Sequence, residues 1–316
     1  MENFDKPILF LFFKRTDTAK RVFLEICNVK PTKLYLAADG PRFDHSEEKE
    51  QCEFLRTSIL SLIDWPCEVK TLFRDNNLGC GRAVSSAIDW FFENESEGII
   101  LEDDCLPGPD FFRFTSEMLD RYRYDSNIMH ISGNFFQKDK IDEADYYFSH
   151  IPHIWGWATW RRAWCQFDYD MVELPEFLKN KKLKNLFPEF INQEQWRYFL
   201  ELMYLKKSDT WDTQWGFALF KNKGLAINPN TNLVSNLGFG VNASHSVVAS
   251  SPWANMSIGS LSNPLVHPSI IKVNAKADYY TNRHHYNFGW MKLLLLKIGL
   301  FKYAQRFYLY LKRLFL

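Results

Sequence analysis

Residues 98–107 have the sequence Gly98-Ile99-Ile100-Leu101-Glu102-Asp103-Asp104-Cys105-Leu106-Pro107, an apolar run that ends in three consecutive carboxylates. The run is typical of a buried strand, so the acids emerge together at the carboxyl edge of a sheet, where open α/β sheets bind ligands. Adjacent negative charges repel one another, and a hard divalent cation relieves that repulsion while it also neutralises a diphosphate. The alternative is a solvated turn in which Asp104 or Asp110 begins the next helix.

The residues before these acids alternate between strand and helix patterns. The patterns predict strands over residues 7–13, 33–38, 68–73 and 98–101, and helices over 16–27, 46–61 and 81–94. This βαβ succession implies a parallel sheet with right-handed crossovers. Such crossovers bring to one edge the polar groups that follow the four strands: Lys14-Arg15, Asp39-Gly40-Pro41-Arg42, Arg74-Asp75-Asn76-Asn77 and Glu102-Asp103-Asp104.

The alternation is lost farther along the chain. A helix is predicted over 110–124 and a strand over 128–132, and no regular pattern continues after residue 134. Residues 146–170 are dense in aromatic side chains, which either pack against sugar faces or form core. The segment 229–246 is predicted to be a long loop, and 250–268 irregular connecting chain.

Composition limits the classes of function. The 316 residues, 46% of them hydrophobic, suffice for one large or two closely packed domains. Lys plus Arg and Asp plus Glu number 38 each, so no global field attracts nucleic acid, and none is expected as a partner. The six cysteines show no C-x-x-C spacing, which disfavours a structural zinc site or a disulfide scaffold. Residues 1–6 lack the basic lead of a secretory signal, so a cytoplasmic location is expected.

The segment 288–316 contains six bases and no acid, interleaved with apolar residues. This pattern predicts an amphipathic helical tail that lies on an anionic membrane surface, with the protein held peripherally at the cytoplasmic face. Its charges are too frequent for a helix that spans the bilayer. A carboxyl-terminal helix docked on the body, or on a second subunit, is the alternative; the oligomeric state is not predicted.

The acidic segment and the residues after it, Cys105-Leu106-Pro107-Gly108-Pro109-Asp110-Phe111-Phe112, resemble the metal-binding segment of GT-A glycosyltransferases. The pattern is similar to that of the N-acetylglucosaminyltransferase I type, in which an apolar strand runs into Glu-Asp-Asp and then a Pro-Asp-Phe-Phe helix start. The resemblance extends loosely over residues 7–246, through the strand order, an aromatic Gly-Trp segment, a Trp-Asp motif and a late His-Ser loop.

This resemblance implies a metal and a nucleotide-sugar donor. It implies that Asp104 ligates Mn²⁺ or Mg²⁺ bridging the donor diphosphate, that Asp103 hydrogen-bonds the ribose and that Glu102 orients the site from the sugar side. A single protein ligand suits a hard ion that keeps waters and takes phosphate oxygens as its other ligands.

Three further donor contacts are expected. The resemblance implies that Asp39 accepts the ring N–H of uracil and that Arg15 lies near the phosphates or the base. Arg82 would add positive charge where the amino terminus of the 81–94 helix already favours an anion. The alternatives are an ordinary turn at Asp39-Gly40-Pro41 and a solvated Arg82.

The candidate catalytic base is Asp212, in Trp211-Asp212-Thr213-Gln214-Trp215. This element resembles the family's Trp-Asp-Asp-Trp, but the second acid is absent and the second Trp comes one residue later. In inverting members a lone carboxylate takes the acceptor proton. The alternative is that Asp212 is a helix N-cap, with Asp209 as the second candidate base.

Two more pairs of residues are expected to contact substrates. Trp157 and Trp211 are the candidate acceptor-binding residues, with core packing as the alternative. His245 and Ser246 follow a glycine-bearing loop that the family closes over the diphosphate, although such a His is usually a surface or packing residue.

The expected fold is therefore α/β of the GT-A type, with a Rossmann-like nucleotide half, a mostly parallel central sheet, an acceptor half and the helical tail. The catalytic domain would span 1–250, divided into 1–107 and 108–250, followed by a connecting segment at 251–287 and the tail at 288–316. The expected activity is metal-dependent, inverting transfer of a sugar from a nucleotide sugar, with UDP favoured, to a glycan or lipid-linked acceptor hydroxyl. Two alternatives remain: a nucleotidyltransferase that makes sugar nucleotides, and a Trp-rich carbohydrate-binding protein at a membrane surface.

Overall fold

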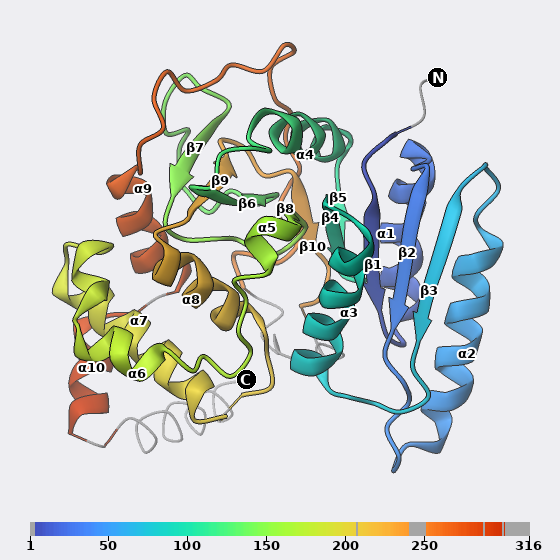
Figure 1. Cartoon of the computed structure of the whole chain (residues 1–316), viewed down its shortest axis with the longest axis horizontal. Coiled ribbons are helices and arrows are strands. Elements are labelled where there is room, and N and C mark those ends of the chain that lie inside the picture. The colour runs from blue at the N-terminus through green and yellow to red at the C-terminus, as the bar shows by residue number, and fades with distance from the viewer. Residues whose placement is uncertain (1–3, 207, 240–250, 287, 299, 301–316) are drawn as a thin grey trace, which may run out of the picture.

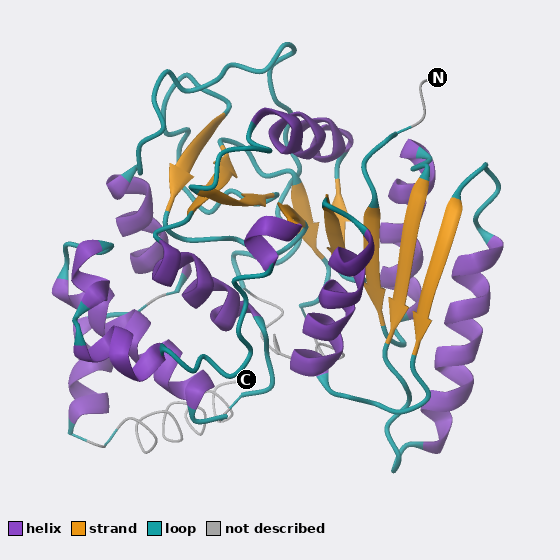
Figure 2. Cartoon of the chain, in the orientation of Figure 1, coloured by secondary structure: helices purple, strands orange, loops and turns teal. Residues whose placement is uncertain are grey.

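The computed structural model describes residues 4–206, 208–239, 251–286, 288–298 and 300. It is an α/β fold built on one eight-stranded sheet, in the order β3-β2-β1-β4-β8-β6-β9-β7 (Figure 1 and Figure 2). The strands of this sheet are β1 (Ile8–Phe12), β2 (Lys33–Ala38), β3 (Glu68–Phe73), β4 (Glu97–Glu102), β6 (Ile128–Ser132), β7 (Tyr146–Ser149), β8 (Trp157–Trp160) and β9 (Leu225–Pro229). A separate antiparallel pair joins β5 (Cys105–Pro107) to β10 (Val234–Asn236).

The helices lie between and around these strands. The longer ones are α1 (Thr16–Val29), α2 (Ser46–Ser61), α3 (Cys80–Asn94), α4 (Pro109–Arg121), α7 (Phe190–Tyr204) and α8 (Asp212–Asn222). The shorter ones are α5 (Arg161–Trp164), α6 (Leu174–Lys179), η1 (Lys182–Asn185), α9 (Ala275–Tyr280), η2 (Thr281–His285) and α10 (Trp290–Lys297).

The first four strands of the central sheet are parallel, as the βαβ pattern predicted. β1 pairs in parallel with β2 on one side and with β4 on the other, and β2 pairs in parallel with β3. The predicted strands over 33–38 and 68–73 and the helix over 46–61 have the predicted bounds. The central sheet is therefore the expected mostly parallel one, with β7 and β8 as its antiparallel members.

Alternate side chains of β1 pack into two different core layers, one on each face of the sheet. Ile8, Phe10 and Phe12 pack with α1, α2 and α4, whereas Leu9 and Leu11 face the opposite layer with α3, α5 and α8. Because strand side chains alternate between the faces of a sheet, a strand covered on both faces is apolar throughout, as β1 is. Figure 1 shows α1 and α3 on opposite sides of the sheet.

The sheet continues across residue 107 into the second half of the chain. β8 lies antiparallel between β4 and β6, and β9 and β7 complete that side. The loop predicted over 229–246 contains the short strand β10, which forms because it pairs with β5 from the acidic segment. No helix or strand interrupts the described residues 251–268, as predicted for connecting chain.

The tail prediction is met only in part by the described residues. One side of α10 packs on α7, where Phe288 and Leu293 join Ile191 in a small core cluster. Trp290 also stacks on Phe190 of α7, and Trp290 and Leu294 are each more than half exposed. Residues 301–316 of the predicted tail lie outside the described residues. Within the described part of the chain, no helix has the length and apolarity needed to cross a bilayer.

Candidate active site

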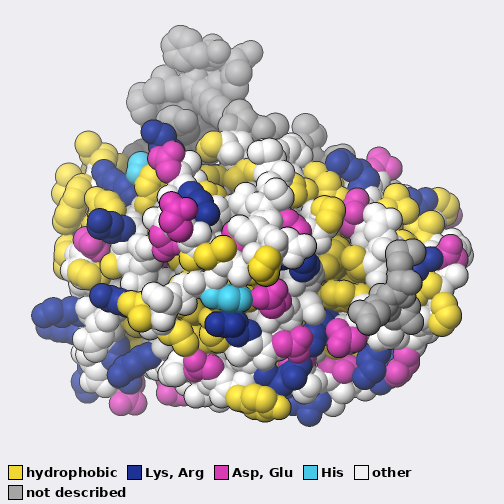
Figure 3. Space-filling model, turned by 90° about the horizontal axis from the view of Figure 1, so that it is seen from above, with side chains coloured by type: hydrophobic (Ala, Val, Ile, Leu, Met, Phe, Trp, Pro, Cys, Tyr) yellow, Lys and Arg dark blue, Asp and Glu magenta, His cyan; other side chains and the backbone are white. Residues whose placement is uncertain are grey.

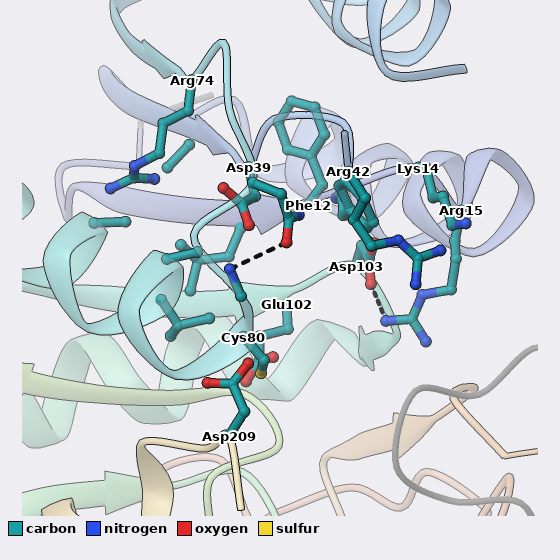
Figure 4. A pocket seen from close by; sticks show the side chains of 18 residues that line it. Phe12, Lys14, Arg15, Asp39, Arg42, Arg74, Cys80, Glu102, Asp103 and Asp209 are labelled. Carbon is teal, nitrogen blue, oxygen red and sulfur yellow. Dashed lines mark hydrogen bonds and ion pairs between the residues drawn. The ribbon is translucent and has the colours of Figure 1, made fainter. Parts of the chain in front are cut away.

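The carboxyl ends of β1 and β4 border a cavity of about 350 Å³. The chain order switches here, since β1 leads outward to β2 and β3 while β4 returns to its other side, and open α/β sheets bind ligands at such a point. The four polar groups predicted to meet at this edge do meet (Figure 4). They contribute Lys14, Arg15, Asp39, Arg42, Arg74, Asn77, Glu102 and Asp103 to the lining.

The acidic segment forms the tight connection from β4 to β5. Asp103 is buried, accepts the backbone N–H of Phe13 at 3.3 Å and forms an ion pair with Arg15. Arg15 also contacts a second acid, since its Nη2 lies 3.0 Å from Asp104 Oδ2. Figure 4 shows Arg15 directed at Asp103, while Glu102, Cys80 and Asp209 lie close together at the other side of the cavity.

The acids are crowded enough to perturb one another's ionisation. Burial raises the pKa of Glu102, and the charges of Asp104 and Asp103 raise it further. Burial also raises the pKa of Asp103, although the Arg15 guanidinium opposes this. Burial works against the charge of Arg15, but the two aspartates outweigh it and raise the pKa of Arg15. Three carboxylates thus share one guanidinium, which leaves an excess of negative charge.

This donor set fits a hard divalent cation that has few protein ligands. Carboxylate oxygens are what Mg²⁺ and Mn²⁺ prefer. Among the described residues, only His45, Glu47 and Glu48 bring three potential ligand atoms within 4.8 Å of one another, and Glu48 there is paired with Lys14 and Arg42. The acids at the end of β4 do not form such a group, so a cation held there would need water or phosphate oxygens as its other ligands. Asp104 itself is not among the residues that line the cavity, and its role as a ligand stays a prediction.

The end of β10 lies directly on Asp104. The backbone N–H of Leu237 donates to the Asp104 carbonyl oxygen at 2.8 Å. A Cβ at position 238 would lie 2.1 Å from Asp104 Oδ2, closer than any real contact, so the backbone can approach this carboxylate only because residue 238 is glycine. The chain thus brings a segment from its second half onto the candidate cation ligand.

Three bases that the sequence analysis placed at this edge, without giving them a donor contact, also line the cavity. Lys14 and Arg42 are both held by the carboxylate of Glu48, which is fully buried. The hydrogen bond from Arg42 lowers the pKa of Glu48 to about 2 despite its burial. The third base is Arg74, which donates to Ser86 at 2.8 Å. Their signal in the sequence was position alone, since each follows a predicted strand, as Arg15 does.

Asp39 lies at the cavity and is also the turn residue that the alternative proposed. Its carboxylate accepts the backbone N–H groups of Leu78 and Gly40, each at 3.0 Å. Burial raises its pKa, although these hydrogen bonds oppose the shift. A carboxylate offers about four acceptor positions, so Asp39 keeps capacity for a further N–H donor from a ligand.

Arg82 does not line the cavity, which corrects the expectation of a donor contact. Its guanidinium stacks on the ring of Tyr169, 3.8 Å from the centroid, and lies 3.5 Å from Asp170. On the first turn of α3 the side chain points away from the sheet edge, toward the second half of the molecule. The position of Arg82 near the start of a predicted helix did not show which side of that helix faces the cavity.

Asp212 is the first residue of α8 and lies close enough to the acids to act on them. Its charge contributes to the raised pKa of Glu102, and its carboxylate is hydrogen-bonded by the Thr210 hydroxyl. Asp209 lines the cavity and accepts the backbone N–H of Gly81 at 2.9 Å. The fold therefore brings Asp209 to the cavity from the other half of the chain, whereas Asp212 is not among the residues that line it.

The two candidate acceptor tryptophans are buried, so the structure does not support the expected aromatic platform. Trp157 is 0% and Trp211 2% exposed, and their rings stack on each other at 5.4 Å between centroids. Both belong to the core layer beneath α8. The core alternative therefore describes them, since β8 and α8 pack their inner faces together.

His245 and Ser246 lie outside the described residues, so the expected loop contacts stay predictions.

Comparison with known proteins gives matches among solved structures only. No protein-family model and no curated protein sequence matches the chain. Among solved structures, UDP-glucose pyrophosphorylase complexed with UDP-glucose is similar at 9% identity and a TM-score of 0.35, over 71% of this chain and 90% of that one. Apo UDP-glucose pyrophosphorylase gives 10% and 0.31, over 70% and 90%, and HddC from Yersinia pseudotuberculosis 14% and 0.31, over 54% and 86%. Similarity this low does not transfer an activity, so the function of this chain has to be argued from its own cavity.

Proposed function

We propose that the protein is a metal-dependent, inverting glycosyltransferase that uses a nucleotide sugar, with UDP as the favoured nucleotide. The observation that supports this most is that Glu102 and Asp103 line one cavity at the topological switch point together with four bases, while Asp104 is joined to that cavity through Arg15. The bases would neutralise a diphosphate, and the carboxylates would hold a cation that supplies further positive charge there. The acceptor is a hydroxyl of a glycan or of a lipid-linked saccharide.

Each residue of the donor site has a separate task in this proposal. Asp39 accepts the ring N–H of the base, and Asp103 accepts a ribose hydroxyl. Asp104 ligates Mn²⁺ or Mg²⁺, and Glu102 orients the transferred sugar. Arg15 spans Asp103 and Asp104 in the structure, and donor binding shifts its contacts toward the phosphates.

The transfer itself needs one base. The acceptor oxygen attacks the anomeric carbon on the side opposite the phosphate, and its proton passes to Asp212. The bond from the anomeric carbon to the phosphate oxygen breaks, and the nucleoside diphosphate leaves with the electron pair. When bound, the divalent cation supplies positive charge against the charge that develops on that diphosphate.

Nucleotidyl transfer from UTP to a sugar phosphate is the second candidate, because four bases around the cavity suit a triphosphate as well as a diphosphate. That chemistry calls for a glycine-rich loop after the first strand. Only Phe13, Lys14 and Arg15 separate β1 from α1, and none of them is glycine. We therefore place glycosyl transfer first.

A non-enzymatic carbohydrate-binding protein finds less support. That alternative relied on exposed tryptophan platforms, yet the largest fully buried side chains include Trp157, Trp160, Trp211 and Trp215. A buried ring offers no face to a sugar.

Calorimetry and product analysis test the proposed function together. The full chain is expected to bind UDP in the presence of Mn²⁺ and much more weakly after chelation. Incubation with a set of UDP-sugars is expected to release UDP slowly by hydrolysis. Release of pyrophosphate from UTP and a sugar phosphate would establish nucleotidyl transfer instead. Absence of UDP binding would refute the UDP-dependent transferase, and absence of UTP binding as well would refute both enzymatic functions.

We also propose that α10 holds the protein at the cytoplasmic face of an anionic membrane. Its outward face is apolar, and the exposed fractions of Trp290, Met291, Leu294 and Ile298 range from 54% to 71%. The basic residues of 288–316 match an anionic surface in charge. On the face of the folded body that Figure 3 shows, acidic and basic side chains are interspersed.

Substitution rather than truncation tests this membrane contact, because removing residue 288 onward would also remove the buried Phe288 and Leu293. The triple variant Trp290→Ser, Met291→Ser, Leu294→Ser is expected to stay in the supernatant when the wild type sediments with anionic vesicles. The variant Phe43→Ser changes an exposed aromatic elsewhere and should sediment normally. Sedimentation of the triple variant would show that α10 is not the anchor.

A further inference from the structure

A second cavity adjoins the first and is not used by the donor in the proposed function. It has a volume of about 330 Å³ and is lined by Tyr169, Asp170, Met203, Tyr204, Lys206, Ser208, Asp209 and Gln214. Asp209 lines both cavities, so the two share a wall at the amino terminus of α3. That wall is thin, because Gly81 sits against the Tyr169 hydroxyl and the Asp209 carboxylate.

The second cavity contains a polar group without a partner among the described residues. Gln214 is 3% exposed, and its Nε2 donates to the Thr210 carbonyl oxygen at 2.8 Å. Its Oε1 has no hydrogen-bond partner in the described part of the chain. An amide oxygen only accepts, so the group that satisfies it is an O–H or N–H donor.

The described lining of this cavity does not favour an anion. Asp170 lies 3.2 Å from Lys206 Nζ and also pairs with Arg82. Asp209 accepts the N–H of Gly81, and no ion pair balances its charge among the described residues. This excess of negative charge disfavours an anionic ligand. Tyr204, 42% exposed, and Met203 provide apolar surface of the kind that packs on the C–H face of a sugar ring.

The cavity also lies beside the start of α8, which carries the proposed base. Gln214 and Asp212 are both on the first turns of α8, and Thr210 is hydrogen-bonded to each of them. Asp209, the second candidate base, lines both cavities. A saccharide in the second cavity would therefore lie next to both candidate bases.

We infer that this second cavity is the acceptor subsite and that it takes a saccharide without an acidic group, with a hydroxyl donating to Gln214 and a ring face on Tyr204. The inference rests on the proposed function for its role as acceptor site. Its commitment to a saccharide without an acidic group comes from the unbalanced carboxylate of Asp209 and the unpartnered amide oxygen of Gln214.

Saturation-transfer NMR on the full chain tests the inference with three probes: methyl β-D-glucopyranoside, methyl α-D-mannopyranoside and methyl β-D-glucuronide. At least one neutral glycoside is expected to receive saturation, and the glucuronide is not. Tyr204→Ala and Gln214→Met are expected to weaken binding of that glycoside by about tenfold each. Because Tyr204 is exposed, its variant keeps the test valid even where Gln214→Met perturbs folding.

Two controls separate this inference from the proposed function. Tyr124→Ala removes a tyrosine that is 92% exposed and lines neither cavity, and should bind saccharide normally. UDP binding with Mn²⁺ is measured on every variant, and Tyr204→Ala should retain it. Saturation of the glucuronide alone, of no probe, or of Tyr204→Ala as strongly as wild type would overturn the inference. Saccharide binding without any UDP binding would refute the proposed function and, with it, the acceptor role.

Discussion

The two sides of the central sheet carry different kinds of residue at the site. On the side of β1 to β4, each strand ends at or is followed by charged residues, and charges from all four strand ends line the first cavity. On the side of β6 to β9, the layer beneath α8 is filled by stacked tryptophans, and its contributions to the site come from the start of α8 and the end of β10. The first side is thus built to hold a charged ligand, and the second to position a base and a covering segment beside it.

If this division is right, the largest change in transfer rate is expected from substituting the base on the β6-to-β9 side, and donor binding should be kept. Asp212→Asn is expected to lower the transfer rate by about a thousandfold or more, because the acceptor proton loses its base. The dissociation constant for UDP with Mn²⁺ should stay unchanged, and calorimetry beside a turnover assay measures both. Asp209→Asn is the matched variant; if it alone abolishes transfer, the base is Asp209.

The tryptophan layer can be tested through stability. Trp157→Ala is expected to lower the free energy of unfolding by about 3–5 kcal/mol, since the ring is fully buried against Trp211. Urea unfolding measures this. Phe43→Ala, at an exposed position, should change stability by less than about 0.5 kcal/mol. A stable Trp157→Ala variant that loses only saccharide binding would restore the acceptor role for this residue.

Substitutions of the acids on the β1-to-β4 side are expected to change UDP binding. Asp104→Asn is expected to weaken Mn²⁺-dependent UDP binding by about a hundredfold, because the amide supplies no negative charge to the cation. Calorimetry with and without Mn²⁺ measures the change. Glu47→Gln alters an exposed carboxylate of the other acidic cluster and should bind UDP as the wild type does. If both variants bind UDP with the same affinity, Asp104 is not a ligand of the cation.

The contact between the segment after β10 and Asp104 can be disrupted by substituting Gly238. Gly238→Ala places a methyl group against Asp104 Oδ2, so the end of β10 must move, and UDP binding with Mn²⁺ is expected to weaken by about tenfold. The control is Gly216→Ala in α8, where the nearest atom to the added methyl lies 4.0 Å away. Unchanged affinity in Gly238→Ala would mean that β10 does not help to shape the cation site.

The smallest expected effect is that of Glu102→Gln on how the stability of the metal-free protein depends on pH. The pKa of Glu102 is raised by burial and by the neighbouring acids, so the folded state holds a proton that the unfolded state releases. Its contribution to stability is present at low pH and is lost as the pH rises through the raised pKa. Glu102→Gln should therefore lose less stability over that range than wild type, as thermal unfolding at a series of pH values would show. Glu50→Gln, an exposed control, should follow the wild type.

Parts of the site could be predicted because they depend on neighbours along the chain. Lys14, Arg15, Asp39 and the three acids follow strands whose apolar runs are short and continuous, and parallel crossovers place such strand ends together. The side on which Arg82 lies, the burial of Trp157 and the pairing of β5 with β10 depend on contacts with distant segments. No local pattern encodes those contacts.

The sequence by itself determined the parallel βαβ half of this protein, the cluster of acids at the end of β4 and the bases that face it. The physical reason is that strand periodicity and crossover handedness are local properties of the chain. Only the tertiary structure decided that Glu48 holds Lys14 and Arg42, that Gly238 lies on Asp104 and that a second cavity shares Asp209 with the first. Those relations depend on which faces of distant elements pack together, and packing is settled by the whole fold at once.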